Sequence, residues 1–113
     1  MANLIENQVF CTSLNAEKFN EFKTLIRDAE NGGDPFEGLD VRYDDVFIQG
    51  ENDKRIDFIF ISRGEPYIDF FRVLSERYEL ILNCNYKEPL EGFYGFFSIE
   101  CGSITEQIGN DFL

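Results

Sequence analysis

Residues 55–63 read RIDFIFISR, the most strand-prone segment of the chain. β-Branched and aromatic side chains dominate it, and such side chains favour an extended backbone. Alternate positions of a strand point to opposite faces. The two faces here are Ile56, Phe58 and Phe60 on one side, and Ile59 and Ile61 on the other. Because both faces are apolar, we predict an interior strand.

Two segments that precede this strand also predict extended structure. Residues 4–12, LIENQVFCT, are partly apolar on both faces, which is typical of a central strand. Residues 41–48 predict a short or interrupted strand, and the adjacent Asp44 and Asp45 indicate a bulge or a bend within it. Residues 50–53 then have the composition of a turn that leads into the interior strand.

Two segments near the C-terminus predict further strands. Residues 79–86, ELILNCNY, alternate apolar and polar side chains and predict one buried face. Residues 93–101, FYGFFSIEC, predict a last strand, in which Gly95 indicates a bulge or a close approach of another chain segment. No structure is predicted for the tail from Thr105 onward.

Two segments have the 3.6-residue periodicity of amphipathic helices. The first begins at Asn15, a good N-cap residue, and ends near Glu30, before the turn sequence of residues 31–35. The second is expected to start at Glu65-Pro66, with proline in the first helical position. The apolar stripes are Phe19, Phe22 and Ile26 in the first helix, and Tyr67, Phe70, Phe71, Leu74 and Tyr78 in the second.

The predicted order is β, α, β, β, α, β, β in a single domain over residues 1–113, a length that suits one domain. Two helices with one apolar stripe each require a shared sheet, so the fold class is α+β. The first six elements have the order of the ferredoxin-like βαββαβ sandwich. The full prediction is that sandwich with an added C-terminal strand, and with two helices on one face of a mainly antiparallel sheet. The residues expected on the open face include Ile81, Asn83, Tyr94 and Phe96.

Residues near the two ends of the chain indicate a family. They are Asn3, Asn7 and Val9 in the opening strand, the turn Tyr86-Lys87-Glu88-Pro89, and Phe93 and Gly95 after it. With these residues the chain resembles the YubB-type ferredoxin-like domain proteins carried by plasmids and phages. The resemblance implies the βαββαβ core and an origin on a mobile element. It supplies no catalytic residues, and Glu88-Pro89 is interpreted as a structural turn.

The chain is strongly acidic, with 22 Asp and Glu, 10 Lys and Arg, and a formal net charge of −12. This charge repels phosphate backbones and anionic membranes, so it disfavours conventional nucleic-acid binding and favours basic protein partners. The acidity is concentrated in residues 28–53, DAENGGDPFEGLDVRYDDVFIQGEND, where nine carboxylates accompany one base, Arg42. A simpler interpretation is that the charge serves only solubility.

The sequence offers little for catalysis, and we predict a non-enzymatic protein without a cofactor. It has no histidine, which removes the commonest general base and the usual zinc ligand. Neither GxGxxG nor a phosphate-binding GxxxxGK motif occurs. Cys11, Cys84 and Cys101 lack CxxC spacing and are expected to be reduced thiols. Oxygen ligands for a hard cation are an alternative; the carboxylates considered are Asp40, Asp44 and Asp45, or Asp53 and Asp57.

Carboxylates held along one surface can imitate the phosphate field of DNA and occupy a basic groove. The best specific hypothesis is therefore a DNA-mimic inhibitor of a host defence nuclease complex, either an anti-CRISPR or an anti-restriction protein. The expected partner-binding residues are Asp34, Glu37, Asp40, Asp44, Asp45, Glu51 and Asp53. The alternatives are an acidic module that binds a protein partner through its open sheet face, and a weak carboxylate metal-binding protein.

The expected partner is a basic protein or nucleoprotein complex, such as a CRISPR or restriction effector, and a homodimer is left open. Direct binding to nucleic acid or to a membrane is not expected. The N-terminal residues lack a basic leader followed by an apolar core, and no apolar run approaches the roughly 20 residues of a membrane span. The expected location is the cytoplasm, that of the host cell if the protein is phage-encoded.

Overall fold

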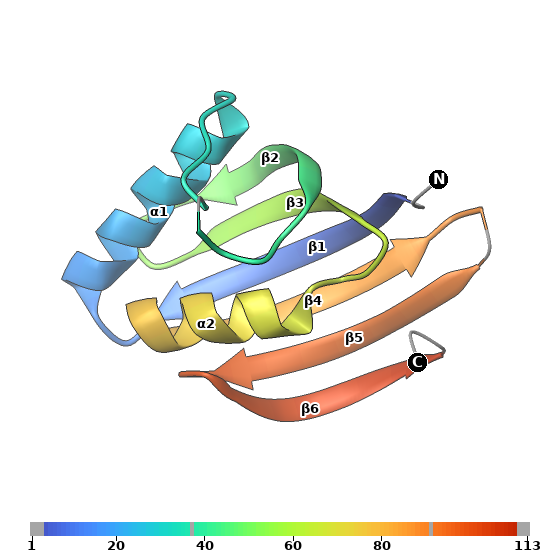
Figure 1. The fold of residues 1–113 in the computed structure, drawn as a ribbon. Coiled ribbons are helices and arrows are strands. Elements are labelled where there is room, and N and C mark those ends of the chain that lie inside the picture. Colours follow the sequence, from blue (N-terminus) through green and yellow to red (C-terminus); the bar gives the residue numbers. More distant parts are fainter. Residues whose placement is uncertain (1–3, 37, 91, 111–113) are drawn as a thin grey trace.

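The computed structural model describes residues 4–36, 38–90 and 92–110 as two helices and one six-stranded sheet (Figure 1). The elements are β1 (Leu4–Ser13), α1 (Ala16–Glu30), β2 (Tyr43–Glu51), β3 (Ile56–Arg63), α2 (Ile68–Tyr78), β4 (Leu80–Glu88), β5 (Phe93–Glu100) and β6 (Ser103–Asn110). The strands lie in the order β2-β3-β1-β4-β5-β6, and every neighbouring pair is antiparallel. The predicted α+β class with an antiparallel sheet is confirmed. No helix in this described part of the chain is long and apolar enough to cross a membrane.

The central strand is β1, which pairs with β3 on one side and with β4 on the other, as its apolar composition predicts. Both helices cover the same face of the sheet (Figure 1). The side chains buried beneath them come from alternate positions of the strands; on the four inner strands they include Ile5, Val9, Cys11, Ile56, Phe58, Phe60, Leu80, Leu82, Cys84, Phe97 and Ile99. The opposite face has no described element over it, which leaves a two-layer arrangement.

A polar residue, Asn7, is fully buried in the middle of β1. Its Nδ2 amide donates hydrogen bonds to the carbonyl of Phe60 and to the hydroxyl of Ser62, both at 2.9 Å. The Ser62 hydroxyl in turn donates to the carbonyl of Glu65 at 2.6 Å. Because a buried amide is tolerated only when it is hydrogen-bonded, this network fixes the position of β1 against β3 and of the turn that follows β3.

The first helix has the boundaries that its sequence predicts. Asn15 caps the N-terminus, since its Oδ1 accepts a hydrogen bond from the Lys18 amide at 3.1 Å. The helix ends at Glu30, after which the amide of Asn31 donates to the carbonyl of Arg27 at 3.0 Å. The predicted apolar stripe is buried against the sheet.

The second helix begins later than the sequence predicts. The pattern places Pro66 in its first turn, whereas α2 starts at Ile68. Tyr67 interrupts the helix because its backbone is left-handed, with φ 59° and ψ 53°. The hydrogen bond from Ser62 to the Glu65 carbonyl holds this segment as a turn, so proline precedes the helix and does not open it.

β2 forms one edge of the sheet and is irregular, as its broken pattern predicts. Its register against β3 shifts between Tyr43 and Asp45, and again between Ile48 and Gly50. The first shift confirms the irregularity expected at Asp44 and Asp45. Because an extra residue reverses which side chains face the helices, these two shifts determine where the charges of the strand point.

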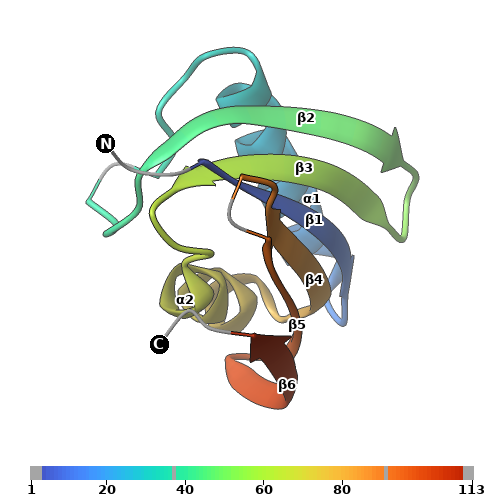
Figure 2. The same ribbon diagram turned by 90° about the vertical axis from the view of Figure 1, so that its right-hand side faces the viewer.

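The sheet has one strand more than the sequence predicts. The expected single added strand is β5, but a two-residue turn at Cys101 and Gly102 leads back into β6 along its outer side (Figure 2). Both turn residues have positive φ, 47° and 89°, as tight hairpins require. No side chain from Ser103 to Gly109 is buried, so β6 lacks the alternating pattern that reveals the other strands.

Gly95 marks a close approach, one of the two features expected of it. It pairs with Tyr86 on β4 and with Gly109 on β6. A Cβ atom on Gly95 would overlap the phenol oxygen of Tyr86 and lie 2.9 Å from the carbonyl oxygen of Ile108. A Cβ atom on Gly109 would lie 2.5 Å from the same phenol oxygen. The two glycines therefore form a slot that the ring of Tyr86 fills.

We expect Gly95→Ala to lower the free energy of unfolding by about 1–3 kcal/mol, because the added methyl must displace the Tyr86 ring or the backbone of β6. Gly50→Ala is the matched control in another strand, where a Cβ atom would lie 3.7 Å from the Asp57 carboxylate, an ordinary contact. Urea denaturation measures both variants. Equal losses in the two would contradict the slot.

Cys101 adopts a left-handed backbone that asparagine tolerates better, and its side chain is exposed. Replacing it should relieve local strain without removing a buried contact. We therefore expect Cys101→Asn to raise the free energy of unfolding by about 0.5–1 kcal/mol. Thermal unfolding under reducing conditions checks this, and Cys101→Val, which disfavours positive φ, should change stability in the opposite direction.

Candidate functional site

The acidic stretch surrounds a concavity of about 540 Å³ at one end of the β2 edge. It lies between the C-terminal end of α1, the loop that follows, the start of β2 and the end of β3. The residues that line it are Ala29, Glu30, Gly32, Gly33, Asp34, Val41, Arg42, Tyr43, Asp44, Asp45 and Arg63. Four of these are carboxylates and two are arginines, so the concavity is open, polar and acidic in balance.

Local sequence explains the shape of the loop. Gly32 has φ +89°, which ends the helix without strain. The amide of Gly33 donates to the carbonyl of Asp28 at 2.9 Å, and a side chain on Gly33 would overlap the Asp28 carboxylate. Phe36 is buried below the loop, with its ring centroid 4.9 Å from that of Phe70 and 5.4 Å from that of Tyr43. The aromatic contact anchors an otherwise polar loop to the core.

Two interactions hold the walls of the concavity together. Arg63 Nε donates to Asp44 Oδ1 at 2.5 Å, and this hydrogen bond raises the pKa of Arg63. The hydroxyl of Tyr43 donates to the carbonyl of Gly33 at 3.3 Å. Partial burial of Tyr43 raises its phenol pKa, and the negative charge of Asp34 adds to the effect.

The structure brings together only part of the predicted binding set. Asp34, Asp44 and Asp45 lie at the concavity. Asp40 is exposed on the loop and lines a separate, smaller depression, whereas Glu37 lies outside the described residues. The members therefore do not form one uniform row.

The other two predicted residues lie toward the far end of β2. Glu51 is turned toward α1 by the second register shift and forms ion pairs with Arg27 and, at 3.9 Å, with Lys23. Asp53 is exposed in the turn between β2 and β3. Since a strand of nine residues spans roughly 30 Å, Asp53 lies well away from the concavity.

Charge pairing divides the predicted residues into two kinds. Asp44 and Glu51 are neutralised by arginines of this chain. Asp34, Asp40, Asp45 and Asp53 are exposed, and no basic side chain of the described residues lies within 4.0 Å of them. Only the second kind offers a net negative charge to a partner.

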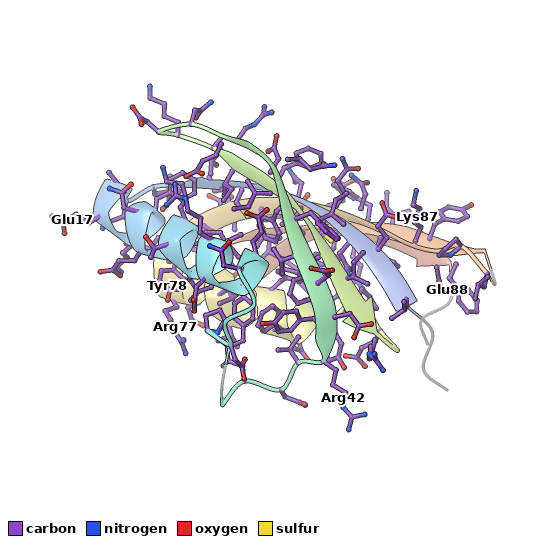
Figure 3. All side chains as sticks on the ribbon, turned by 90° about the horizontal axis from the view of Figure 1, so that it is seen from above. Glu17, Arg42, Arg77, Tyr78, Lys87 and Glu88 are labelled. Atoms are coloured by element: carbon purple, nitrogen blue, oxygen red, sulfur yellow. The ribbon has the colours of Figure 1, made fainter. Side chains whose placement is uncertain are left out.

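Sequence reasoning did not assign a role to three residues of this edge. Glu30 accepts a hydrogen bond from the exposed amide of Ile48 at 2.6 Å, which covers part of the strand edge. Arg63 neutralises Asp44 across the β2–β3 pair. Arg42 extends away from the body of the molecule (Figure 3). Glu30 and Arg42 belong to the acidic stretch, but only the fold shows which way each one points.

The open face of the sheet is a second candidate surface. The register aligns one row of side chains across all six strands: Phe47, Ile59, Gln8, Asn85, Phe96 and Ile108. Phe47, Ile108 and Tyr94 are exposed by 48%, 62% and 63%. Asn83, one of the residues expected on this face, is joined to the neighbouring strand, since its Oδ1 accepts a hydrogen bond from the Ser98 hydroxyl at 2.6 Å. The face is therefore mixed, with large apolar side chains between amides.

The described residues contain no group of three His, Cys, Asp or Glu side chains placed to hold a metal ion. Cys11 and Cys84 are buried, and burial raises the pKa of both thiols, whereas Cys101 is exposed. Asp57 is nearly buried, with Oδ2 accepting from Arg55 at 2.6 Å and Oδ1 without a hydrogen-bond partner among the described residues. The negative charge of Asp57 adds to the effect of burial on the Cys11 pKa, so its thiol favours the neutral form.

No protein-family model, curated protein or solved structure matches this chain.

The electrostatics of the concavity can be tested through Tyr43. We expect Asp34→Asn to lower the phenol pKa of Tyr43 toward its ordinary value, because a nearby negative charge that opposes ionisation is removed. An NMR titration that follows the Tyr43 ring carbon measures the shift. Asp53→Asn, at the other end of β2, should leave this pKa unchanged; equal effects of the two variants would contradict the geometry.

Proposed function

We propose that this chain is a non-enzymatic binding protein whose acidic β2 edge engages a basic surface of another protein. The observation that supports it best is the set of exposed, unneutralised carboxylates on and around one edge strand: Asp34, Asp40, Asp45 and Asp53. Charges of one sign attract a complementary partner and accelerate encounter with it. In this proposal Asp44 and Glu51 stabilise the fold and do not contact the partner, since each forms an ion pair with an arginine of the chain.

The fold supports a finer assignment, which we also propose. Four neighbouring strands have the order β2-β3-β1-β4, and both helices lie on one face. This arrangement fits a ferredoxin-like sandwich extended by the hairpin of β5 and β6. It is compatible with kinship to the YubB-type proteins of plasmids and phages, and with a role in the cytoplasm of a host cell.

The sharpest form of the proposal is a DNA mimic that inhibits a host CRISPR or restriction complex. Duplex DNA carries one phosphate per roughly 1.7 Å of axis, so a basic groove that holds DNA also attracts a surface of closely spaced carboxylates. The concavity gathers Glu30, Asp34 and Asp45 at one end of β2, and Asp53 lies at the other end. Such a surface would contact the groove at two places separated by the length of the strand.

A purified CRISPR or restriction effector complex tests this proposal. We expect binding that competes with DNA and weakens steeply as salt is raised, because screened charges no longer attract. The triple variant Asp34→Asn, Asp40→Asn and Asp45→Asn should weaken binding by at least about tenfold. A matched triple variant away from this edge, Glu76→Gln, Glu100→Gln and Glu106→Gln, removes the same charge and should have a much smaller effect.

Two results would contradict the acidic edge as the binding surface. One is affinity that does not change with salt. The other is an equal loss of affinity in the two triple variants, which would mean that only the net charge matters.

The open sheet face is the second candidate, favoured by the exposure of Phe47 and Tyr94. If a protein partner binds there, Tyr94→Ser or Phe96→Ser should weaken binding more than charge reversal at Asp45 does. A carboxylate metal site has less support, because the described residues supply no trio of ligands for it.

A further inference from the structure

The edge strand β6 forms although its described side chains are not buried. It is the last strand of the sheet (Figure 2). Every residue from Ser103 to Gly109 is exposed. Ordering the backbone of one residue costs at least as much free energy as a typical hydrogen bond returns. Besides its contact with α2, β6 is held by its ladder to β5, so further pairing would stabilise it.

The two edges of the sheet differ in how open they are to pairing. At the β2 edge, two register shifts bend the strand, and the Glu30 carboxylate occupies the amide of Ile48. Charges and bulges of this kind prevent edge-to-edge pairing. β6 reads SITEQIGN, with one charge, Glu106, no proline and one register shift. Its outward amides and carbonyls are therefore the pairing groups that the described sheet leaves available.

The open face beside the C-terminal half of β6 is mainly apolar. A shallow concavity of about 460 Å³ on the open face is lined by Asn85, Tyr94, Gly95, Phe96, Ile108 and Gly109. Ile108 is 62% exposed there, whereas Ile104 lies on the helix side of the sheet, where it pairs with Ile99 and lines a depression beside Ile68. A second strand placed along β6 would cover Ile108, so main-chain and apolar contacts would form together.

We propose that β6 is the docking edge for a second copy of this chain, which pairs antiparallel with β6 of the first copy about a two-fold axis. An edge strand is complementary to itself in this orientation, as an isologous dimer interface requires. The charge distribution selects this edge. Two chains of net charge −12 repel each other, but here they would meet at the strand farthest from the acidic β2 edge.

The distances make this arrangement electrostatically tolerable. Strands in a sheet lie about 4.8 Å apart, so the two β2 edges of a continuous twelve-stranded sheet would be roughly 50 Å from each other. The screening length at physiological salt is about 8 Å, so repulsion between the two acidic edges would be negligible. The dimer would present two acidic edges at its opposite ends. This inference goes beyond the proposed function, which requires only one of them.

Light scattering after size-exclusion chromatography tests the dimer, from about 1 µM to about 1 mM protein under reducing conditions. We expect the mass to rise with concentration from 13.2 kDa to twice that value. Higher salt should strengthen the dimer because it screens repulsion between acidic chains, the opposite of its effect on a complex with a basic partner.

Two variants locate the interface. Ile108→Lys places a charge beside β6 at an exposed position, and it should raise the dissociation constant at least about tenfold. Phe47→Lys makes a matched change on the same face at the other edge strand, and the dimer should persist. Circular dichroism confirms that both variants are folded.

Three results would overturn the proposal. They are a monomer at every concentration and salt level, a dimer that survives Ile108→Lys, and a dimer that Phe47→Lys disrupts equally. Hydrogen exchange gives a second measurement on the unmodified chain. Amides of β6 should become protected as the concentration rises, and unchanged exchange across the dimer transition would place the interface elsewhere.

Discussion

The aromatic cluster around Phe60 holds the separate parts of this molecule together. The ring centroid of Phe60 lies 5.1 Å from that of Tyr43, 5.6 Å from that of Phe70 and 5.5 Å from that of Phe71. Phe36 joins the same cluster at 6.2 Å. One residue of β3 thereby connects the edge strand, the second helix and the acidic loop, and its carbonyl accepts the hydrogen bond from buried Asn7. The polar site keeps its shape because this apolar cluster lies beneath it.

The sequence predicts elements well where burial on one face creates a pattern. The alternation in β1, β3, β4 and β5 follows directly from the two-layer arrangement, and Asn15 supplies a local signal that no distant contact overrides. β6 was not predicted for the converse reason: its residues from Ser103 to Gly109 are all exposed, so they do not alternate between apolar and polar side chains. The start of α2 is missed because the left-handed backbone of Tyr67 depends on the turn built by Ser62.

The sequence shows that the candidate site is acidic, but it does not show where each carboxylate points. The carboxylates are evident in the sequence, but their directions depend on two register shifts in β2. The second shift turns Glu51 inward to Arg27, and the pairing of β2 with β3 brings Arg63 to Asp44. Both ion pairs join residues distant in sequence, so no local rule separates the neutralised carboxylates from the exposed ones.

The slot beneath Tyr86 has a consequence for how the C-terminal hairpin tolerates changes of length. The turn at Cys101 and Gly102 sets which residue of β6 reaches the ring, and only Gly109 leaves room for it. Insertion of one residue in this turn would move the bulkier Ile108 beneath the phenol, and a deletion would move Asn110 there. The Tyr86 ring therefore tolerates only one length of this turn. Homologous chains should conserve the spacing between Gly95 and Gly109 more strictly than the residues between them.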